Sequence, residues 1–190
     1  MATAAAAAAG SSNQTEPSST AGATTSTTVE TTPVDTTASR WERRAAAAWR
    51  RHIRRFRADT RHWLTVIRGR PPANVSRSLL SRSLRGLRQV ALRWRHRARR
   101  AWWQANHPPG LRGWLCIHRY EGSWADPGSP YWGGLQMDLS FQATYGGWLL
   151  RHKGTADHWS PLEQIWVAVR ASHARGFSPW PNTARYCGLM

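Results

Sequence analysis

The stretch Cys116-Ile117-His118-Arg119-Tyr120-Glu121-Gly122-Ser123-Trp124 places a single carboxylic acid among aromatic side chains, directly before a glycine. Residues 111–120 fit a helix, so Glu121 is expected at the C-terminal end of that helix, with Gly122 as its terminator. A carboxyl group there faces the negative end of the helix dipole, which disfavours its ionised form. Aromatic neighbours that exclude water act in the same direction. We therefore expect Glu121 to keep its proton near neutral pH, as a general acid must.

A second informative segment, Tyr131-Trp132-Gly133-Gly134-Leu135-Gln136-Met137, follows a loop that contains proline and glycine. Its Gly-Gly-Leu-Gln run is typical of segments that line a sugar cleft, and residues 135–137 are expected to form a short strand or an extended piece. The aromatic rings of both segments can stack on sugar faces. Since cleavage of a glycosidic bond requires a protonated carboxyl group, the two segments together favour glycoside chemistry.

Two more helices are expected in the C-terminal part of the chain. Asp138 can cap a helix that Gly146-Gly147 would end. Ser160-Pro161-Leu162-Glu163 combines an N-cap, a proline at the first helical position and a capping box, and it predicts a helix to about Ala174. The tail at residues 177–181 is expected to be extended.

The charge of the chain is concentrated in one segment. The 190 residues carry a formal net charge of +17, and residues 40–106 hold 20 of the 26 arginines and only two acidic residues. Residues 1–39 are rich in serine and threonine, carry no basic residue and have too little apolar area to offset the entropy of ordering. The composition therefore predicts a disordered segment 1–39, an Arg-rich segment 40–107 and a C-terminal domain 108–190.

The Arg-rich segment shows helical periodicity twice. Residues 41–68 form the first predicted helix, and a second is predicted from an N-cap near Ser76 to Pro108-Pro109. Two helices of similar length joined by a short proline-containing turn predict an antiparallel hairpin. Repulsion among the arginines opposes this pairing, so we expect an anionic partner or only marginal order. The apolar stripes are Ala46, Trp49, Ile53, Phe56, Thr60, Trp63 and Ile67, then Leu80, Leu84, Leu87, Ala91, Trp94, Ala98 and Ala101.

Two cysteines, Cys116 and Cys187, bracket the C-terminal domain. An even number of cysteines at domain ends favours a disulfide in an oxidising compartment, with two buried free thiols as the alternative. A zinc site is disfavoured because these cysteines and His118 lack a standard ligand spacing, and no cofactor or metal is predicted. No stretch is long and apolar enough to span a membrane, and the alanine-rich start lacks the features of a signal peptide. Either export uses a start site upstream of Met1, or the protein is not exported.

An ordered series of residues runs through the C-terminal domain. It consists of Glu121, Trp124, Tyr131-Trp132-Gly133-Gly134-Leu135-Gln136, Ser140-Phe141, Tyr145-Gly146, Glu163-Gln164, Gly176-Phe177 and Trp180-Pro181. The series resembles the resuscitation-promoting factor (transglycosylase-like) family of actinobacterial wall enzymes, within the lysozyme-like superfamily, over about residues 111–189. The resemblance implies a mainly α protein: a small lysozyme-like α+β catalytic domain, preceded here by the Arg-rich antiparallel helical hairpin and the disordered N-terminal segment.

The resemblance also implies roles for single residues. Glu121 matches the catalytic glutamate of the family. The positions that match substrate contacts are Gln136, Ser140 (where the family usually has threonine) and Gln164, while Trp124, Tyr131 and Trp132 would shape the cleft. The implied substrate is the MurNAc-GlcNAc β-1,4 bond of peptidoglycan glycan strands, and the implied location is secreted or associated with the cell wall.

The sequence departs from the family pattern in two places. Only Gly122-Ser123 separate Glu121 from Trp124, two residues fewer than the family commonly has. In many members one cysteine directly precedes the glutamate and the other directly follows the Trp-Pro segment. Here Cys116 lies five residues before Glu121, and Cys187 lies six residues after Pro181. Both cysteines have moved outward together, as a retained bridge requires.

Lysozyme-type hydrolysis normally uses a second carboxylate. The candidates are Asp126, Asp138, Asp157 and Glu163. Asp138 and Glu163 already have expected helix-capping roles. Because no partner stands out, the sequence favours a lytic transglycosylase with one acid over a muramidase-type glycoside hydrolase.

Two alternatives come from other functional classes. The shortened segment after Glu121 fits a non-catalytic wall-binding module. The Arg-rich helices could instead bind nucleic acid through its phosphates, although the near-neutral C-terminal domain argues against this. In the favoured hypothesis, residues 40–106 dock the enzyme on anionic wall polymers or on a membrane surface.

Overall fold

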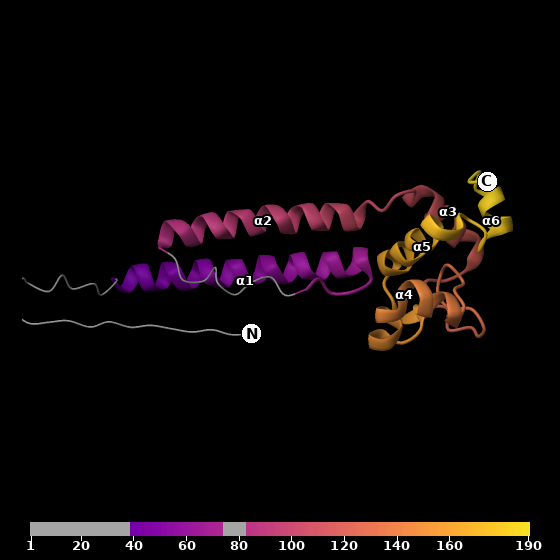
Figure 1. The fold of residues 1–190 in the computed structure, drawn as a ribbon, viewed down its shortest axis with the longest axis horizontal. Helices are drawn as coiled ribbons and strands as arrows, with labels where there is room; N and C mark the ends of the chain where they lie inside the picture. The colour runs from indigo at the N-terminus through magenta and orange to yellow at the C-terminus, as the bar shows by residue number, and fades with distance from the viewer. Residues whose placement is uncertain (1–38, 74–82) are drawn as a thin grey trace, which may run out of the picture. The chain divides into compact units, whose positions relative to one another are not determined.

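The computed structural model of the chain describes residues 39–73 and 83–190. Within these residues the protein is mainly helical, which confirms the predicted helical class. This part of the chain has no β-strand, so the strands of an α+β domain are not found in it; it has an isolated bridge between Trp132 and Met137. The helices are α1 Arg40–Arg68, α2 Leu84–Asn106, α3 Leu111–Glu121, α4 Leu139–Lys153, the 3-10 helix η2 Ala156–His158, α5 Pro161–Arg175 and α6 Pro181–Tyr186 (Figure 1).

Helix α1 begins and ends where the sequence predicts. The Ser39 hydroxyl accepts from the Glu42 N–H at 3.3 Å, and the Glu42 carboxylate accepts from the Ser39 N–H at 2.8 Å, which completes a capping box. Gly69 ends the helix in the left-handed conformation, with φ of 68°, and its N–H donates to the Thr65 carbonyl.

Helix α2 begins at Leu84, and Ser83 is its N-cap. The predicted start near Ser76, the stripe residue Leu80 and the predicted disorder of residues 1–38 all lie outside the described residues. Neither α1, α2 nor any other helix in the described ranges is long and apolar enough to cross a membrane.

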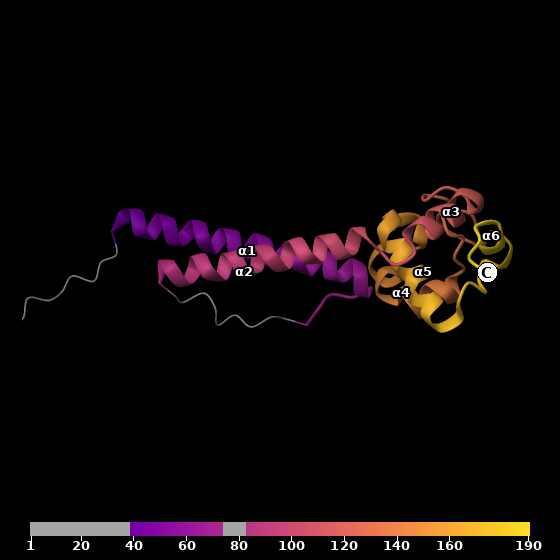
Figure 2. The same cartoon turned by 90° about the horizontal axis from the view of Figure 1, so that it is seen from above.

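The two long helices run parallel, not antiparallel as the sequence predicted (Figure 1, Figure 2). Their contacts advance in the same direction: the Arg57 guanidinium lies 5.4 Å from the Trp94 ring centre, and farther along both helices Trp63 and Trp102 line one groove. The prediction was wrong because it began the second helix too early and so assumed a short turn. Residues 69–83 connect the helices, and at about 3.3 Å per residue such a segment can return over the roughly 35 Å length of α2.

The apolar stripes of α1 and α2 pack on each other, as their spacing predicts. Ile53 and Leu87 are fully buried, and Trp94 is 5% exposed. The guanidinium groups of Arg57 and Arg97 lie 5.4 and 5.0 Å from the centre of the Trp94 ring. Such cation–π contacts offset part of the repulsion among the arginines.

A second core lies within the C-terminal domain, around the buried helix α5. Trp114, Trp159 and Trp180 are each at most 3% exposed and belong to this core. Trp180 donates from its indole N–H to the Leu135 carbonyl at 2.7 Å. Trp180 is therefore a core residue of this domain.

Helix α4 continues past Gly146-Gly147, where the sequence predicted its end. Gly146 has non-helical dihedrals (φ −129°, ψ 20°), so the helix kinks there and resumes to Lys153. The second half carries Leu149, which is fully buried, so tertiary packing outweighs the low helix propensity of glycine. A Cβ atom at Gly146 would lie 2.7 Å from the Trp159 ring, so this glycine permits close packing.

Helix α5 contacts the C-terminal ends of both long helices. The Trp166 indole N–H donates to the Ala105 carbonyl at 2.9 Å, and Arg170 Nη1 donates to the Ile67 carbonyl at 2.8 Å. The last carbonyls of a helix lack partners within it, so two side chains one turn apart on α5 satisfy both helix ends. Burial lowers the pKa of Arg170 to about 10, a desolvation cost that these hydrogen bonds help to offset.

Candidate active site

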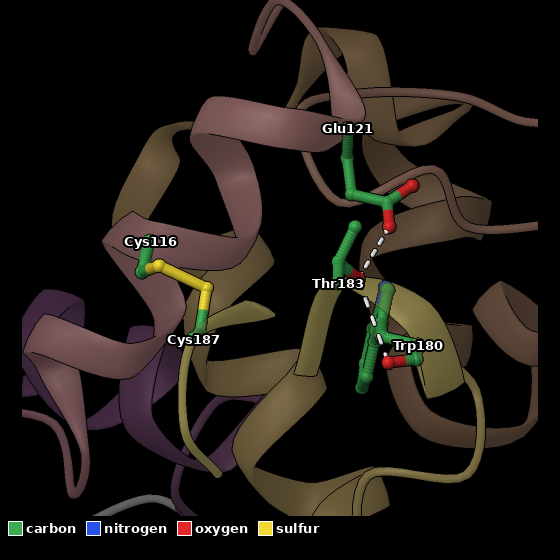
Figure 3. The surroundings of a disulfide bond; sticks show 5 residues. All are labelled: Cys116, Glu121, Trp180, Thr183 and Cys187. Carbon is green, nitrogen blue, oxygen red and sulfur yellow. Dashed lines mark hydrogen bonds between the residues drawn. A yellow bond between two sulfur atoms is a disulfide. The ribbon is translucent and has the colours of Figure 1, made fainter. Parts of the chain in front are cut away.

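Glu121 is the last residue of α3, as predicted, and Gly122 follows it with φ of 140°, a value that favours glycine. The Glu121 side chain is partly exposed and points toward α6, where the Thr183 hydroxyl donates to Glu121 Oε1 at 2.8 Å (Figure 3). Among the described residues, no side chain or main-chain group bonds Oε2 of Glu121. One carboxylate oxygen is thus held in place, and the other is available to a ligand.

A disulfide joins Cys116 to Cys187, with a Cα–Cα distance of 5.9 Å (Figure 3). Cys116 lies within α3, and Cys187 directly follows α6. The bridge therefore ties the helix that ends at Glu121 to the helix that carries Thr183. The disulfide that the two cysteines predicted is therefore present in the structure.

The loop that follows Glu121 is organised around Asp126. Asp126 Oδ1 accepts from the Gly128 N–H at 3.1 Å, and Asp126 Oδ2 accepts from Gln136 Nε2 at 2.8 Å. A Cβ atom at Gly122 would lie 3.4 Å from that same Oδ2 and 3.5 Å from Gln136 Nε2. The structure therefore brings Gln136, one of the predicted substrate contacts, next to the residue that follows Glu121.

Gln136 adopts a left-handed backbone conformation, with φ of 47°, which is uncommon for a residue other than glycine. Its N–H donates to the Gly133 carbonyl at 3.0 Å, and the paired main chains of Trp132 and Met137 close the turn on either side. A strained residue of this kind persists only where its surroundings hold it, and such residues cluster at functional sites. The turn presents the Gln136 side chain at a fixed place beside Gly122, the residue that follows Glu121.

Gln164 fastens the same loop from beneath, because it is fully buried in α5. Its Oε1 accepts from the Gly134 N–H at 2.9 Å, and its Nε2 donates to the carbonyls of Trp124 and Ala156, both at 2.8 Å. A Cβ atom at Gly133 would lie 2.5 Å from Gln164 Oε1. The Gln164 amide is thus occupied by main-chain groups of the loop.

The aromatic residues predicted to shape a cleft lie at different depths. Trp124 stacks on His118 with ring centroids 3.8 Å apart, and His118 Nδ1 lies 3.1 Å from the Gly134 carbonyl, so His118 packs against both Trp124 and the glycine loop. A Cβ atom at Gly134 would lie 2.5 Å from His118 Nδ1, so only glycine lets the loop approach this closely. Tyr131 is 49% exposed, whereas Trp132 is half-buried against the core.

Ser140, the third predicted substrate contact, belongs to the cap of α4. It is exposed, and its hydroxyl donates to Asp138 Oδ1 at 2.7 Å. The same oxygen accepts from the Phe141 N–H at 2.7 Å, which makes Asp138 the N-cap, as predicted. The Phe141 N–H, followed by the Ser140 hydroxyl, lowers the pKa of Asp138.

Four of the five carboxylates in residues 108–190 serve the fold. Asp126 holds the loop and Asp138 caps α4, while Asp157 Oδ2 lies 3.2 Å from the imidazole of His158. Glu163 is 4% exposed, completes the predicted capping box of α5 and pairs with the Lys153 ammonium at 2.6 Å. Glu121 is the fifth, and its partner is a neutral hydroxyl.

No sequence pattern indicated Thr183, which lies 62 residues from its partner Glu121. Residues 177–181 were expected to be extended, yet Pro181 starts α6. Proline at a first helical position is itself a start signal, and it could have revealed this helix. The pairing of Asp126 with Gln136 was also missed.

Within the described ranges, no group of three or more His, Cys, Asp or Glu side chains is placed to hold a metal ion. The sequence matches no model of a known protein family, and no curated protein matches it. The site must therefore be interpreted from its own residues and geometry.

Proposed function

We propose that this protein is a lytic transglycosylase of lysozyme-like type, which cleaves the MurNAc-GlcNAc β-1,4 bond of bacterial peptidoglycan with Glu121 as its single acid and base. The observation that carries the proposal is the situation of Glu121. Among the five carboxylates of residues 108–190, it is the one that caps no helix, fastens no loop and contacts no ammonium or imidazole group. The residue that follows it, Gly122, lies beside the strained turn that carries Gln136.

In the proposed reaction, the protonated Glu121 donates its proton to the bridging glycosidic oxygen as the bond from that oxygen to C1 of the muramic sugar breaks. The resulting carboxylate then removes the proton of the muramic 6-hydroxyl, whose oxygen attacks C1. The product is a 1,6-anhydro sugar, the carboxylic acid is regenerated, and no water is consumed. One carboxyl group therefore completes the whole cycle.

The hydrogen bonds of Asp126 favour a mechanism that uses one carboxyl group over hydrolysis, which uses two carboxyl groups. Hydrolysis needs a second carboxylate that acts as nucleophile or activates water. Asp126 is the carboxylate nearest along the chain after Glu121, and both of its oxygens already accept hydrogen bonds.

The neighbours of Glu121 take supporting roles in this proposal. Gln136 and the exposed ring of Tyr131 would contact the glycan, and Trp124 would form the wall behind them. Gln164 acts as a positioning residue, because its amide holds the loop. The substrate would place the protein at the cell wall, where a disulfide such as Cys116–Cys187 is maintained.

The test is digestion of purified peptidoglycan by the full chain, with mass analysis of the soluble products. Wild type should release 1,6-anhydro muropeptides, and Glu121→Gln should lower the rate by about 100-fold or more, since it removes the transferable proton. Asp126→Asn is the comparison variant: it neutralises the neighbouring carboxylate and weakens its hold on the loop, so it should lower the rate far less than Glu121→Gln and leave the anhydro products unchanged.

Each contrary outcome has a distinct meaning. Equal rates for wild type and Glu121→Gln would remove Glu121 from the chemistry. Reducing-end products without anhydro sugars, lost in both variants, would show a hydrolase with two carboxylates. Binding of peptidoglycan by wild type without any cleavage would assign the domain to non-catalytic wall binding.

A further inference from the structure

One side of the α1–α2 pair combines exposed large apolar side chains with arginines. Four large apolar residues on these helices are well exposed: Trp41 is 65%, Leu92 41%, Trp102 49% and Trp103 56% exposed. Side chains of this size are usually covered when they lie on helices that already have a buried apolar stripe. The packing of α1 on α2 does not account for the exposure of these side chains.

Helix geometry places these residues on one face. On α2, Arg88, Leu92, Arg95, Arg99 and Trp102 recur at spacings of three and four, which is the repeat of a single helix face. All three of these arginines are exposed.

On α1, Trp41 and Asp59 are separated by five full helical turns, so both lie on the same face of the helix. Asp59, Phe56 and Trp63 form the α1 wall of a groove of about 360 Å³, and its α2 wall includes Arg95, Arg99 and Trp102. We call this side the Trp–Arg face, and it consists of Trp41, Phe56, Trp63, Arg88, Leu92, Arg95, Arg99, Trp102 and Trp103.

The opposite side of the helix pair differs in kind. A groove of about 720 Å³ there is lined by Arg54, Arg97 and by Pro71, Pro72 and Ala73, where the chain leaves α1. The described start of the connection between the helices therefore lies on that side. Residues 71–73 therefore do not line the groove of the Trp–Arg face.

We propose that the Trp–Arg face binds the surface of an anionic lipid bilayer, with the helix pair lying in the plane of the interface. Tryptophan rings prefer the level of the lipid headgroups, and arginine forms bidentate contacts with phosphate. A basic helix with tryptophan and leucine on its apolar side is the pattern of helices that lie on membranes. A double-stranded nucleic acid is held by charge at its phosphates and gains little from exposed Trp and Leu side chains. Asp59, the acid of this face, is half-buried in the groove between the helices.

The experiment is sedimentation of the full chain with vesicles of mixed phosphatidylglycerol and phosphatidylcholine, compared with phosphatidylcholine alone. Wild type should bind the mixed vesicles and should bind phosphatidylcholine weakly. Arg95→Gln/Arg99→Gln should weaken binding about 25-fold, from about fivefold for each charge near an anionic surface. Arg93→Gln/Arg100→Gln is the control, because it removes the same charge from exposed positions of α2 away from the Trp–Arg face and should change binding much less.

A second pair of measurements separates a membrane from a soluble polyanion. Trp102→Ser/Trp103→Ser keeps every charge, so it should lower vesicle binding while leaving binding to double-stranded DNA unchanged. Equal losses for the two arginine variants, or vesicle binding that does not change in the tryptophan variant, would overturn the proposal in favour of a diffuse polyanion site. Circular dichroism confirms that each variant keeps its helices. None of these readouts depends on cleavage by Glu121.

Discussion

Replacement of Cys116 and Cys187 by serine should lower the free energy of unfolding of the C-terminal domain by about 4 kcal/mol. The bridge joins residues 71 apart in the sequence, and closing a loop of that length lowers the entropy of the unfolded chain by an amount worth about 4 kcal/mol at 25 °C. For a small domain, each kcal/mol shifts Tm by about 4–8 °C, so the expected decrease is about 20 °C. The C-terminal domain is small and buries little apolar area, so this loss is a large share of its free energy of unfolding.

The assay is thermal unfolding followed by circular dichroism, for wild type and the Cys116→Ser/Cys187→Ser variant, each with and without a reductant. The wild-type Tm should fall to that of the variant when the reductant is added. The variant should not respond to the reductant, which controls for other effects of the reagent.

Equal melting temperatures for the oxidised wild type and the double variant would refute the reasoning. Either the unfolded chain would then be compact already, or α6 would be held equally well without the bridge. Amide exchange at Thr183 distinguishes these cases, because loss of the bridge should expose α6 before the core around Trp180 opens.

Two further predictions concern the core and the helix caps. Gly146→Ala should destabilise the protein by about 1–3 kcal/mol, because its Cβ would lie 2.7 Å from the Trp159 ring, whereas Gly147→Ala would meet only Arg151 Nη1 at 3.5 Å and should be close to neutral in urea unfolding. Similar losses for both alanine variants would contradict this account. The pKa of Asp138 is lowered below 3.8, chiefly by the Phe141 N–H, so its carboxylate stabilises the fold above that pH and loses this effect as pH falls through the folded pKa. Asp138→Asn should therefore be less stable than wild type at neutral pH and should lose less stability on acidification below about pH 4; parallel stability curves for the two proteins would count against it.

The sequence predicted correctly those features whose sequence signal and structure lie within the same few residues. The capping box at Ser160 and the glycine after Glu121 each act within one helical turn, and each of these helix ends lies where predicted. The apolar stripe of α1 similarly needs only the helical repeat. These features depend on local backbone geometry, which the sequence encodes directly.

The features that sequence alone missed depend on residues far apart in the chain. The direction of α2 depends on where that helix starts, and a difference of a few residues changed a short turn into a connection long enough for parallel packing. Gln164 was assigned to substrate by its place in a motif, but its burial and its bonds to Trp124 and Gly134 arise only when α5 packs beneath the loop. Neither hydrophobic periodicity nor a helix-capping motif indicates such contacts.

The short segment between Glu121 and Trp124 has a structural consequence that bears on the site. With two residues between them, Trp124 folds back along α3 and stacks on His118, one turn before Glu121. The Trp124 carbonyl then accepts a hydrogen bond from Gln164. The loop is therefore held by α3 through His118 and by α5 through Gln164. On the other flank, Cys116–Cys187 and the Thr183 hydroxyl hold α6 against the same helix end. Glu121 is thus fixed by contacts from two sides, and neither contact needs a longer segment between Glu121 and Trp124, so the short segment is compatible with the role proposed for Glu121.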